Sequence, residues 1–558
     1  MIMMSKTTAP QILMISMLFI NLMSSFLGSS FAVGEPKCKE AERQALLQLK
    51  EDMYGGDGWD DGLPSWAKEE EKKECCEWVG IRCDSNSGHV TTLDLSPSTF
   101  EDSHSTFSSV GNITSLLAHL PYLNYLDLSG AGFHDKSSMP NVIDALSKLT
   151  KLRYLNLSYT TLSGEIPPKI GNLSSLQFLD LSGNDGLRLK DLQNWLSHLS
   201  SLQLLDLSHT NMSLAHDWIH VVNNLPHLAY LNLSGSSLQN HHVVSPSFLS
   251  HINSSKILSV LDLSRNSLSP LIFQWLFNHS HTLIQLDLHD CQLKTSFPKS
   301  FEKMATLSYL DLSQNQLEGS IPTSFGSENN ALTYLDLSQN RLEGCIPISL
   351  GNNMTSLEYL NLSNNTLEGE IPKSIWKICT LKVLRANDNA LSGQLQLAKS
   401  SRQCVHFSLE YLDLRRNQIM GSLPNITMYS SLVELLLRSN QLNGNVSETL
   451  GQLSQLKILD VSRNFFKGAM SVTHFSKLFN LHRLDLSSNS QLALNNIPSD
   501  WVPPFQLKFF ISGLAFWVPT SQIGFVHKSI MSKLISLIPK FQILFPIGFG
   551  IYHLIYIT

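Results

Sequence analysis

The sequence predicts an α/β solenoid, a curved parallel β-sheet horseshoe built from stacked short units. The phrase YLDLSQNQLEGSIP at 309–322 returns almost unchanged as YLDLSQNRLEGCIP at 334–347. The pattern L-x-x-L-x-L recurs from LNYLDL at 123–128 to LHRLDL at 481–486, mostly at spacings of about 23–26 residues. An earlier copy, VTTLDL, lies at 90–95. The alternating leucines of one short strand can be buried only by neighbouring copies, so we expect about 16 stacked repeats over residues 90–510.

This period and pattern are those of leucine-rich repeats. In many copies an asparagine follows the strand at the bend, where its amide can bond the backbone of neighbouring turns. These residues are Asn184, Asn266, Asn315, Asn340, Asn365, Asn440, Asn464 and Asn489. Cys291 takes the same place in its repeat, which predicts a buried free thiol. The phrase L-x-G-x-I-P comes next, and we expect its glycine to form a turn with positive φ.

Two further columns of residues run through the strands. Aspartate recurs at one strand position, in Asp127, Asp180, Asp206, Asp262, Asp287, Asp311, Asp336, Asp413, Asp460 and Asp485. Tyrosine recurs at another, in Tyr125, Tyr154, Tyr230, Tyr309, Tyr334, Tyr359 and Tyr411. A ligand-binding acidic ladder is one interpretation. We favour the other, in which these are repeat-consensus residues and specificity comes from the positions that vary.

The first 32 residues predict a secretory signal peptide. Lys6 precedes the apolar run ILMISMLFINLMSSFLG, and small residues follow it. An N-terminal transmembrane anchor is the rival interpretation, but Asn21 and serine pairs weaken the apolar run. We expect cleavage between Gly28 and Gly34 and entry into the secretory pathway.

Cysteines and sequons fit an oxidising compartment. Four of the eight cysteines, Cys38, Cys75, Cys76 and Cys83, cluster in the region 33–89, which favours disulfides over a zinc site because no C-x-x-C pair is present. We expect N-glycosylation at the N-x-S/T sequons. These are Asn112, Asn156, Asn172, Asn211, Asn232, Asn253, Asn278, Asn353, Asn361, Asn364, Asn425 and Asn445. Since Asn156, Asn232 and Asn361 stand in the aspartate column, glycans there would obstruct the inner face.

Composition and motifs disfavour two classes of function. The chain has 558 residues and a formal net charge of −6, which gives no indication of nucleic-acid binding, because such binding needs a basic face. No G-x-S-x-G, P-loop, G-x-G-x-x-G or H-E-x-x-H motif is present, so we expect no enzyme activity, no cofactor and no catalytic metal.

Two long stretches carry a family resemblance. CKEAERQALLQLKEDM at 38–53 and CCEWVGIRCDSNSGHVTTLDL at 75–95, with the L-x-G-x-I-P phrase, resemble plant leucine-rich-repeat receptors and their N-terminal cap. The resemblance extends to about residue 510. It is strongest to receptor-like proteins, in the branch of the fungal ethylene-inducing-xylanase receptors and the Cf-type resistance proteins. It implies disulfides Cys38–Cys75 and Cys76–Cys83. Cys379 and Cys404, which lie just before adjacent strands, are expected to form another.

The resemblance also implies a function. It suggests a cell-surface protein without a kinase that recognises a peptide, protein or glycan ligand in defence or development and signals through co-receptor kinases at the plasma membrane. A secreted inhibitor or decoy of microbial cell-wall-degrading enzymes is the alternative, and a non-functional truncated product is a third. The ligand-binding residues are not identified by the sequence.

Residues 511–558 depart from the repeat design. This tail contains no Asp, Glu or Asn, although the preceding chain is rich in all three. We expect a frameshift, an unspliced intron or a gene-prediction error from about residue 511. The alternative is that residues 541–558 form a weak membrane segment. The product would be anchored in the membrane if this segment inserts, and secreted to the apoplast if it does not.

Overall fold

The computed structural model describes residues 37–54, 63, 65–66, 74–100, 113–132, 139–239, 257–327, 331–397, 404, 406–494, 498, 501–507, 509–511, 543–547 and 551–555. The chain divides into two compact units, Met1–Leu162 and Ser163–Thr558. The expected signal peptide, residues 1–32, lies outside the described residues.

The first unit contains the N-terminal cap and the first repeats. Strand β1 pairs antiparallel with β2, and β2, β3 and β4 then pair in parallel. The elements are α2 (Glu40–Tyr54), η2 (Cys75–Glu77), β1 (Ile81–Cys83), β2 (Val90–Asp94), η3 (Pro97–Phe100), α3 (Ile113–Leu117), β3 (Tyr125–Asp127), α4 (Met139–Leu146) and β4 (Tyr154–Asn156).

The cap is fastened to the first repeat strand by a buried carboxylate. Glu42 on α2 accepts a hydrogen bond from the backbone N–H of Val90 at 2.7 Å, and its other oxygen lies 2.8 Å from Nδ1 of His89. Trp66 and Trp78, also in the cap, stack with ring centroids 5.5 Å apart. A buried charge needs partners of this kind, so Glu42 fixes the cap against β2.

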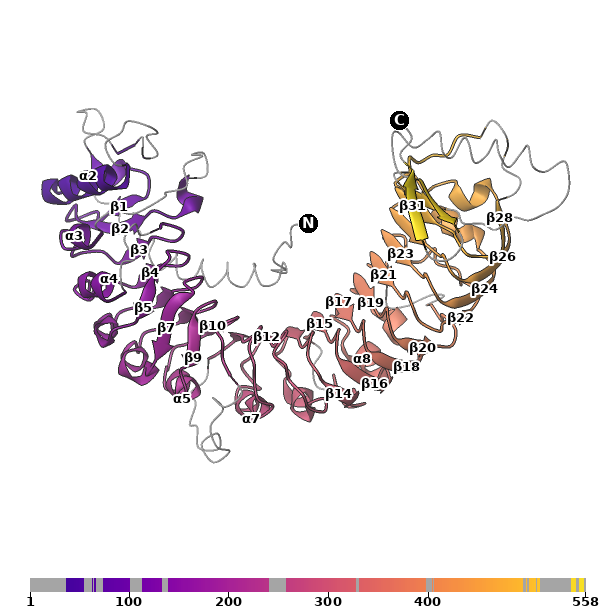
Figure 1. Cartoon of the computed structure of the whole chain (residues 1–558), viewed down its shortest axis with the longest axis horizontal. Coiled ribbons are helices and arrows are strands. Elements are labelled where there is room, and N and C mark those ends of the chain that lie inside the picture. Colours follow the sequence, from indigo (N-terminus) through magenta and orange to yellow (C-terminus); the bar gives the residue numbers. More distant parts are fainter. Residues whose placement is uncertain are drawn as a thin grey trace. The chain divides into compact units, whose positions relative to one another are not determined.

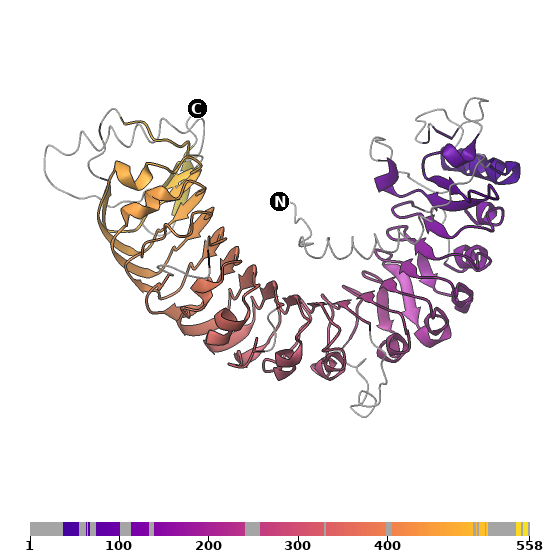
Figure 2. The same cartoon turned by 180° about the vertical axis from the view of Figure 1, so that it is seen from behind.

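The second unit is built on one long parallel sheet, which we call the inner sheet. It follows the concave side of that unit in Figure 1, and the same row of strands is visible from behind in Figure 2. Its strands pair in register from β6 to β29, so that Leu310 lies beside Leu335 and Asp311 beside Asp336. The strands are β6 (Phe178–Asp180), β8 (Leu204–Asp206), β10 (Tyr230–Asn232), β11 (Val260–Asp262), β12 (Gln285–Asp287), β13 (Tyr309–Asp311), β15 (Tyr334–Asp336), β17 (Tyr359–Asn361), β19 (Val383–Arg385), β21 (Tyr411–Asp413), β23 (Glu434–Leu436), β25 (Ile458–Asp460), β27 (Arg483–Asp485) and β29 (Phe509–Ile511).

The L-x-G-x-I-P phrases form additional parallel sheets, which corrects our expectation of a simple turn. The glycines have the expected positive φ, for example 75° at Gly319 and 72° at Gly344. Both nevertheless lie inside strands. These outer strands lie opposite the inner sheet in Figure 1. They are β5 (Ser163–Glu165), β7 (Gly186–Lys190) and β9 (Asn211–Leu214); β14 (Glu318–Ser320), β16 (Arg341–Cys345), β18 (Thr366–Glu370) and β20 (Ala390–Ser392); and β22 (Met420–Gly421), β24 (Gln441–Asn445), β26 (Phe465–Met470) and β28 (Gln491–Leu494).

Short helices complete the repeats of the second unit and bury their apolar side chains between the sheets. Trp275 and Phe301 are examples, at 0% and 1% exposure. The helices are η4 (Pro168–Asn172), η5 (Leu192–Asn194), η6 (Leu196–His198), α5 (Trp218–Asn223), α7 (Ile272–Phe277), η8 (Lys299–Lys303), α8 (Ile348–Asn353), η9 (Ile375–Lys377), η10 (Glu448–Gln452) and η11 (Val472–Phe475).

The asparagine column forms a buried hydrogen-bonded spine, as predicted. Asn315 donates to the carbonyl oxygens of Leu288 at 2.8 Å and of Leu312 at 3.0 Å. Its own oxygen accepts from the backbone N–H groups of Cys291 and Leu293. One side chain thereby satisfies the backbone of two adjacent turns that no strand pairing reaches. Asn389 and Asn417, which our sequence list omitted, make the same bonds.

The described parts of the tail do not form a helix. Strands β30 (Ile543–Ile547) and β31 (Ile551–Ile555) pair antiparallel, so the membrane segment proposed for 541–558 is not helical where the structure describes it. Within the described residues, no helix combines the length and the apolar character needed to cross a membrane.

Candidate ligand-recognition surface

The candidate surface is the solvent side of the inner sheet in the second unit. Successive side chains of a strand point to opposite faces. In β15 the middle residue, Leu335, is therefore in the core, while Tyr334 and Asp336 belong to the other face. Two stretches of this face differ: a consensus segment on β13, β15 and β17, and a basic segment on β19, β21, β23, β25 and β27.

In the consensus segment the tyrosine rings stack on one another, and the aspartate and serine side chains are hydrogen-bonded. The tyrosine rings stack from strand to strand, with centroids 4.3 Å apart for Tyr309 and Tyr334 and 4.4 Å apart for Tyr334 and Tyr359. Asp336 accepts hydrogen bonds from the backbone N–H and the hydroxyl of Ser338 at 2.9 and 2.6 Å, and Asp311 accepts the corresponding pair from Ser313. The repetition of Tyr, Asp and Ser is thus explained by cross-strand packing.

Burial and neighbouring carboxylates perturb the ionisation of this column. Burial, reinforced by Asp262 and Asp311 on the adjacent strands, raises the pKa of Asp287 well above its ordinary value. Burial and the charge of Asp336 raise the pKa of Tyr359 to about 12. Asp311 and Asp336 of the same column are buried and are therefore poor contacts for a ligand, which agrees with the interpretation of the column as repeat consensus.

Asparagine replaces aspartate in this column without breaking its pattern. The Asn361 amide nitrogen donates to Asp336 at 2.9 Å, and its oxygen accepts from the backbone N–H of Ser363 at 3.1 Å. Asn232 donates in the same way to Asp206 at 2.9 Å. Asn232 thereby separates Asp206 from Asp262, two carboxylates that would otherwise repel one another. Asn361, by contrast, lies between Asp336 and Arg385.

The basic segment abandons the consensus at several positions. Arg385 stands in the aspartate column and Arg483 in the tyrosine column. Arginine also replaces the serine or glutamine that follows the strand in the consensus segment, at Arg415, Arg416, Arg438 and Arg463. Arginine thus occurs at four different positions of the repeat within five neighbouring strands.

Some of these guanidinium groups are already paired. Arg415 binds both oxygens of Asp413, at 2.8 and 2.6 Å, and Arg416 lies 3.1 Å from Asp388. Arg385 and Arg483 are both exposed, and neither guanidinium group makes a hydrogen bond or ion pair with any residue that the structure describes. Within the basic segment, these two are the arginines most available to an external anion.

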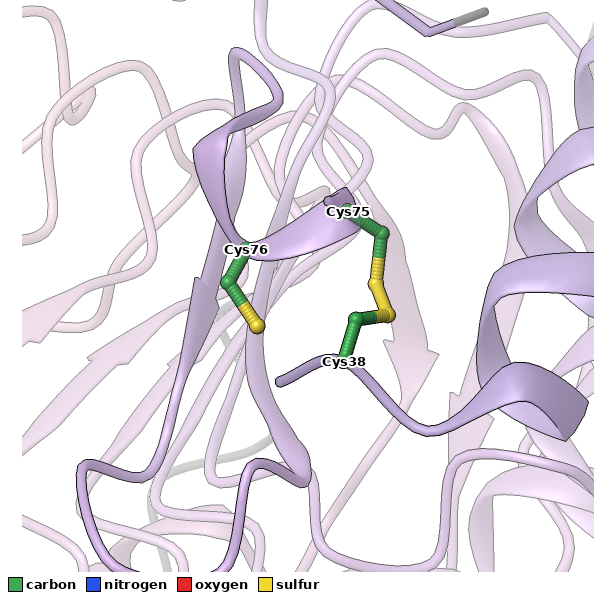
Figure 3. A group of neighbouring side chains, drawn as sticks. All are labelled: Cys38, Cys75 and Cys76. Atoms are coloured by element: carbon green, nitrogen blue, oxygen red, sulfur yellow. A yellow bond between two sulfur atoms is a disulfide. The ribbon is translucent and has the colours of Figure 1, made fainter. Parts of the chain in front are cut away.

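The N-terminal cysteines are disulfide-bonded, as the resemblance implies. Cys38 is joined to Cys75, as Figure 3 shows, and Cys76 is joined to Cys83. The sulfur atoms of Cys38, Cys75 and Cys76 lie within 4.8 Å of one another, the spacing of a metal site. Because all three are consumed in disulfides, none is available as a thiolate ligand.

The remaining cysteines fall into two classes. Cys379 and Cys404 form a third disulfide, which spans a sequence separation of 25 at the start of the basic segment. Cys291 is a free, fully buried thiol, as predicted, and its sulfur donates to the carbonyl oxygen of Leu263 at 3.1 Å. Burial raises the pKa of the Cys291 thiol well above its ordinary value, so it is unreactive. Cys345 is also free and is exposed on an outer strand.

The sequons differ in accessibility. Asn361 is 5% exposed and hydrogen-bonded within the inner sheet, and Asn156 in the first unit donates to Asp127 in the same manner at 3.1 Å. Exposed sequons elsewhere are Asn172, Asn278, Asn364, Asn425 and Asn445, with Asn211 and Asn353 half-buried. Asn112 and Asn253 lie outside the described residues.

The basic segment was missed by our reading of the sequence. Its arginines occupy different columns in different repeats, so no single motif contains them. Comparing the columns with their consensus residue by residue reveals the signal, because Arg385 then stands out against a column of aspartates and asparagines.

Comparison with known families supports the repeat assignment. A leucine-rich-repeat model matches residues 281–342, a second one matches 151–173, 356–378 and 408–428, and a leucine-rich-repeat N-terminal domain matches 39–84. Receptor-like protein EIX1 of Solanum lycopersicum is 38% identical over 292 residues, covering 50% of this chain and 26% of that protein. Receptor-like protein EIX2 of the same species is 39% identical over 166 residues, covering 29% and 15%.

Solved structures show the same architecture. The ectodomain of the Arabidopsis receptor kinase HAESA is 25% identical, with a TM-score of 0.54, and the match covers 84% of this chain and 90% of that one. The chain spans about a quarter or less of the length of the two curated relatives, so their activities are not transferred to it directly. The repeats, the cap and these relatives together identify a leucine-rich-repeat protein that is similar to the plant receptor-like proteins EIX1 and EIX2.

Proposed function

We propose that this chain is an extracellular ligand-recognition protein of the receptor-like class, which catalyses no reaction and carries no kinase. It binds a peptide, protein or glycan in plant defence or development and signals together with a co-receptor kinase. Its place would be the secretory pathway and then the outer face of the plasma membrane, or the apoplast if it is not anchored. The disulfides of the cap support an oxidising compartment.

The observation that carries this proposal is the divided solvent face of the inner sheet. A fold that only had to be stable could repeat Tyr, Asp and Ser in every strand, as β13 and β15 do. The basic segment instead varies the positions that packing does not determine, as recognition surfaces of repeat proteins do. The related HAESA ectodomain is described in complex with the peptide hormone IDA and the co-receptor SERK1, which supports a ligand of this general kind.

The test uses the full chain secreted from leaf cells. A fungal ethylene-inducing xylanase and a panel of other fungal wall-degrading enzymes and plant peptides serve as probes, and binding is measured by surface plasmon resonance. Saturable binding together with ligand-dependent recruitment of a co-receptor ectodomain supports the receptor function. Binding that instead abolishes hydrolysis by the enzyme supports the inhibitor alternative. Absence of binding across the panel contradicts the proposal.

A further inference from the structure

The starting point is that folding does not require the arginines of the basic segment. The repeats stack equally well with Asp336 where Arg385 stands and with Tyr334 where Arg483 stands. Arg416 and Arg463 adopt left-handed backbone, with φ of 52° and 53°. Other repeats place glycine at this position, where such backbone costs less.

The charge of the two segments differs in a way that a ligand would sense. The consensus segment offers enclosed carboxylates and tyrosine rings, with Asp311 and Asp336 no more than 8% exposed. In the basic segment the aspartates are also buried, for example Asp460 at 3%, but the guanidinium groups reach solvent. The side chain of Arg416 is 71% exposed. An anion approaching this face can therefore reach guanidinium groups on strands that lie about 4.8 Å apart. Arg385 on β19 and Arg483 on β27 are four strands apart.

The same face is not uniformly positive. Glu410 and Glu434 are half-exposed beside the arginines, and apolar side chains such as Val383, Leu436 and Ile458 are half-exposed among them. A uniformly charged polyanion would be repelled by the glutamates and would leave the apolar groups uncovered. A peptide can place acidic side chains on the arginines and apolar side chains between them.

We infer that the basic segment binds an extended acidic peptide segment, with Arg385 and Arg483 as the principal contacts for its carboxylates. This inference rests on the proposed function and specifies the ligand class and the strands that read it. Arg415 is already paired with Asp413 and is therefore structural. Arg385 and Arg483 can each donate two hydrogen bonds to one carboxylate without first losing a partner.

The test selects 12-residue linear peptides from a random display library on the immobilised full chain. We expect the selected peptides to combine acidic with apolar residues. For a synthetic selected peptide, the double variant Arg385→Ala/Arg483→Ala should raise Kd by about tenfold. Raising the salt concentration should also weaken binding by the parent chain.

The matched control is Arg265→Ala, which removes an exposed arginine of the same inner-sheet face outside the basic segment and should leave Kd unchanged. A scrambled peptide of identical composition should bind more weakly. Equal melting temperatures of the variants confirm that both are folded. We expect equal melting temperatures because the exchanged side chains are exposed and unpaired.

Several outcomes would overturn the inference. They are peptides without acidic residues, indifference to the double variant, equal binding of the scrambled peptide, or no selected peptide at all. Binding of oligogalacturonate in place of peptides would reassign the surface to wall polysaccharide. The proposed function survives each of these results if another probe binds the chain and recruits a co-receptor, so the two failures can be told apart.

Discussion

The consensus segment and the basic segment share the same asparagine spine but differ in the side chains on their solvent face. Below both, asparagines bond adjacent turns, as Asn315 and Asn417 show. On the solvent face of the consensus segment, Tyr334 and Asp336 are buried among the matching residues of neighbouring strands. Above the basic segment, Arg385 and Arg483 are exposed and unmatched by any described residue. Repetition therefore maintains the stack, and departures from repetition mark where something else is recognised.

The strongest test of a shared spine removes the asparagine in each segment. Asn315→Ala and Asn417→Ala should each destabilise the second unit by about 3 kcal/mol, because buried backbone groups of two turns lose their partners. Denaturant unfolding with hydrogen exchange at neighbouring amides measures the loss. Gln314→Ala, at an exposed position, is the control. A much smaller loss at Asn417 would mean that the basic segment is held by other means.

The disulfide Cys379–Cys404 offers a way to loosen the basic segment alone. Cys379→Ser/Cys404→Ser opens a loop with a sequence separation of 25 and should cost up to about 3 kcal/mol. Hydrogen exchange should increase in β19 and β21 and stay constant in β13. Uniform loosening of both segments would contradict the view that this bond acts locally.

The two aspartates Asp287 and Asp413 should respond to amidation with opposite signs. Asp287 lies between like charges, so Asp287→Asn should stabilise the fold at neutral pH by up to about 1 kcal/mol. Asp413 holds Arg415 through both oxygens, so Asp413→Asn should destabilise it by about 1 kcal/mol. Unfolding at pH 7 measures both variants. The same sign for both would contradict the view that an aspartate flanked by carboxylates and an aspartate paired with an arginine respond differently.

The raised pKa of Asp287 also predicts a pH dependence. Its pKa is higher in the folded than in the unfolded state, so between the two values the folded state binds more protons. The stabilising contribution is complete below the unfolded pKa of about 4 and is lost as pH rises through the folded pKa. Asp206 and Asp262 have raised pKa values for the same main reason, burial. Melting temperature should therefore rise as pH falls from 7 toward 5, and less so in Asp287→Asn.

The sequence predicted the inner sheet and the spine because both depend on strict periodicity. Leucines such as Leu335 and amides such as Asn315 must recur at fixed spacing, or neighbouring turns do not fit. The outer strands were missed because Gly344, with its positive φ, is typical of a turn in a single repeat and becomes part of a strand only when β14 and β18 flank it. The basic segment was missed because exposed positions have no period to follow.

The smallest expected effect concerns sequons whose asparagine side chains are hydrogen-bonded within the inner sheet. Asn361 uses its amide nitrogen, the atom that would carry a glycan, to donate to Asp336 and to the Tyr359 hydroxyl at 2.9 and 3.4 Å. Asn232 uses the same atom to bond Asp206. A glycan would have to displace a buried bond at Asn361 and a partly buried bond at Asn232. We therefore revise the expectation that glycans obstruct the inner face and predict that these two sites are unoccupied.

Glycopeptide mass spectrometry of the secreted chain tests this prediction. Exposed sequons such as Asn278 and Asn425 should carry glycans, while Asn232 and Asn361 themselves should be recovered unmodified. Fragmentation of the glycopeptide must assign the site, because the exposed sequon Asn364 lies three residues after Asn361. Asn361→Asp should then leave the glycan mass unchanged and destabilise the fold by less than about 1 kcal/mol at pH 7, by placing a carboxylate beside Asp336. A glycan found on Asn361 would mean that the consensus segment is sterically closed, and recognition would be left to the strands from β19 onward.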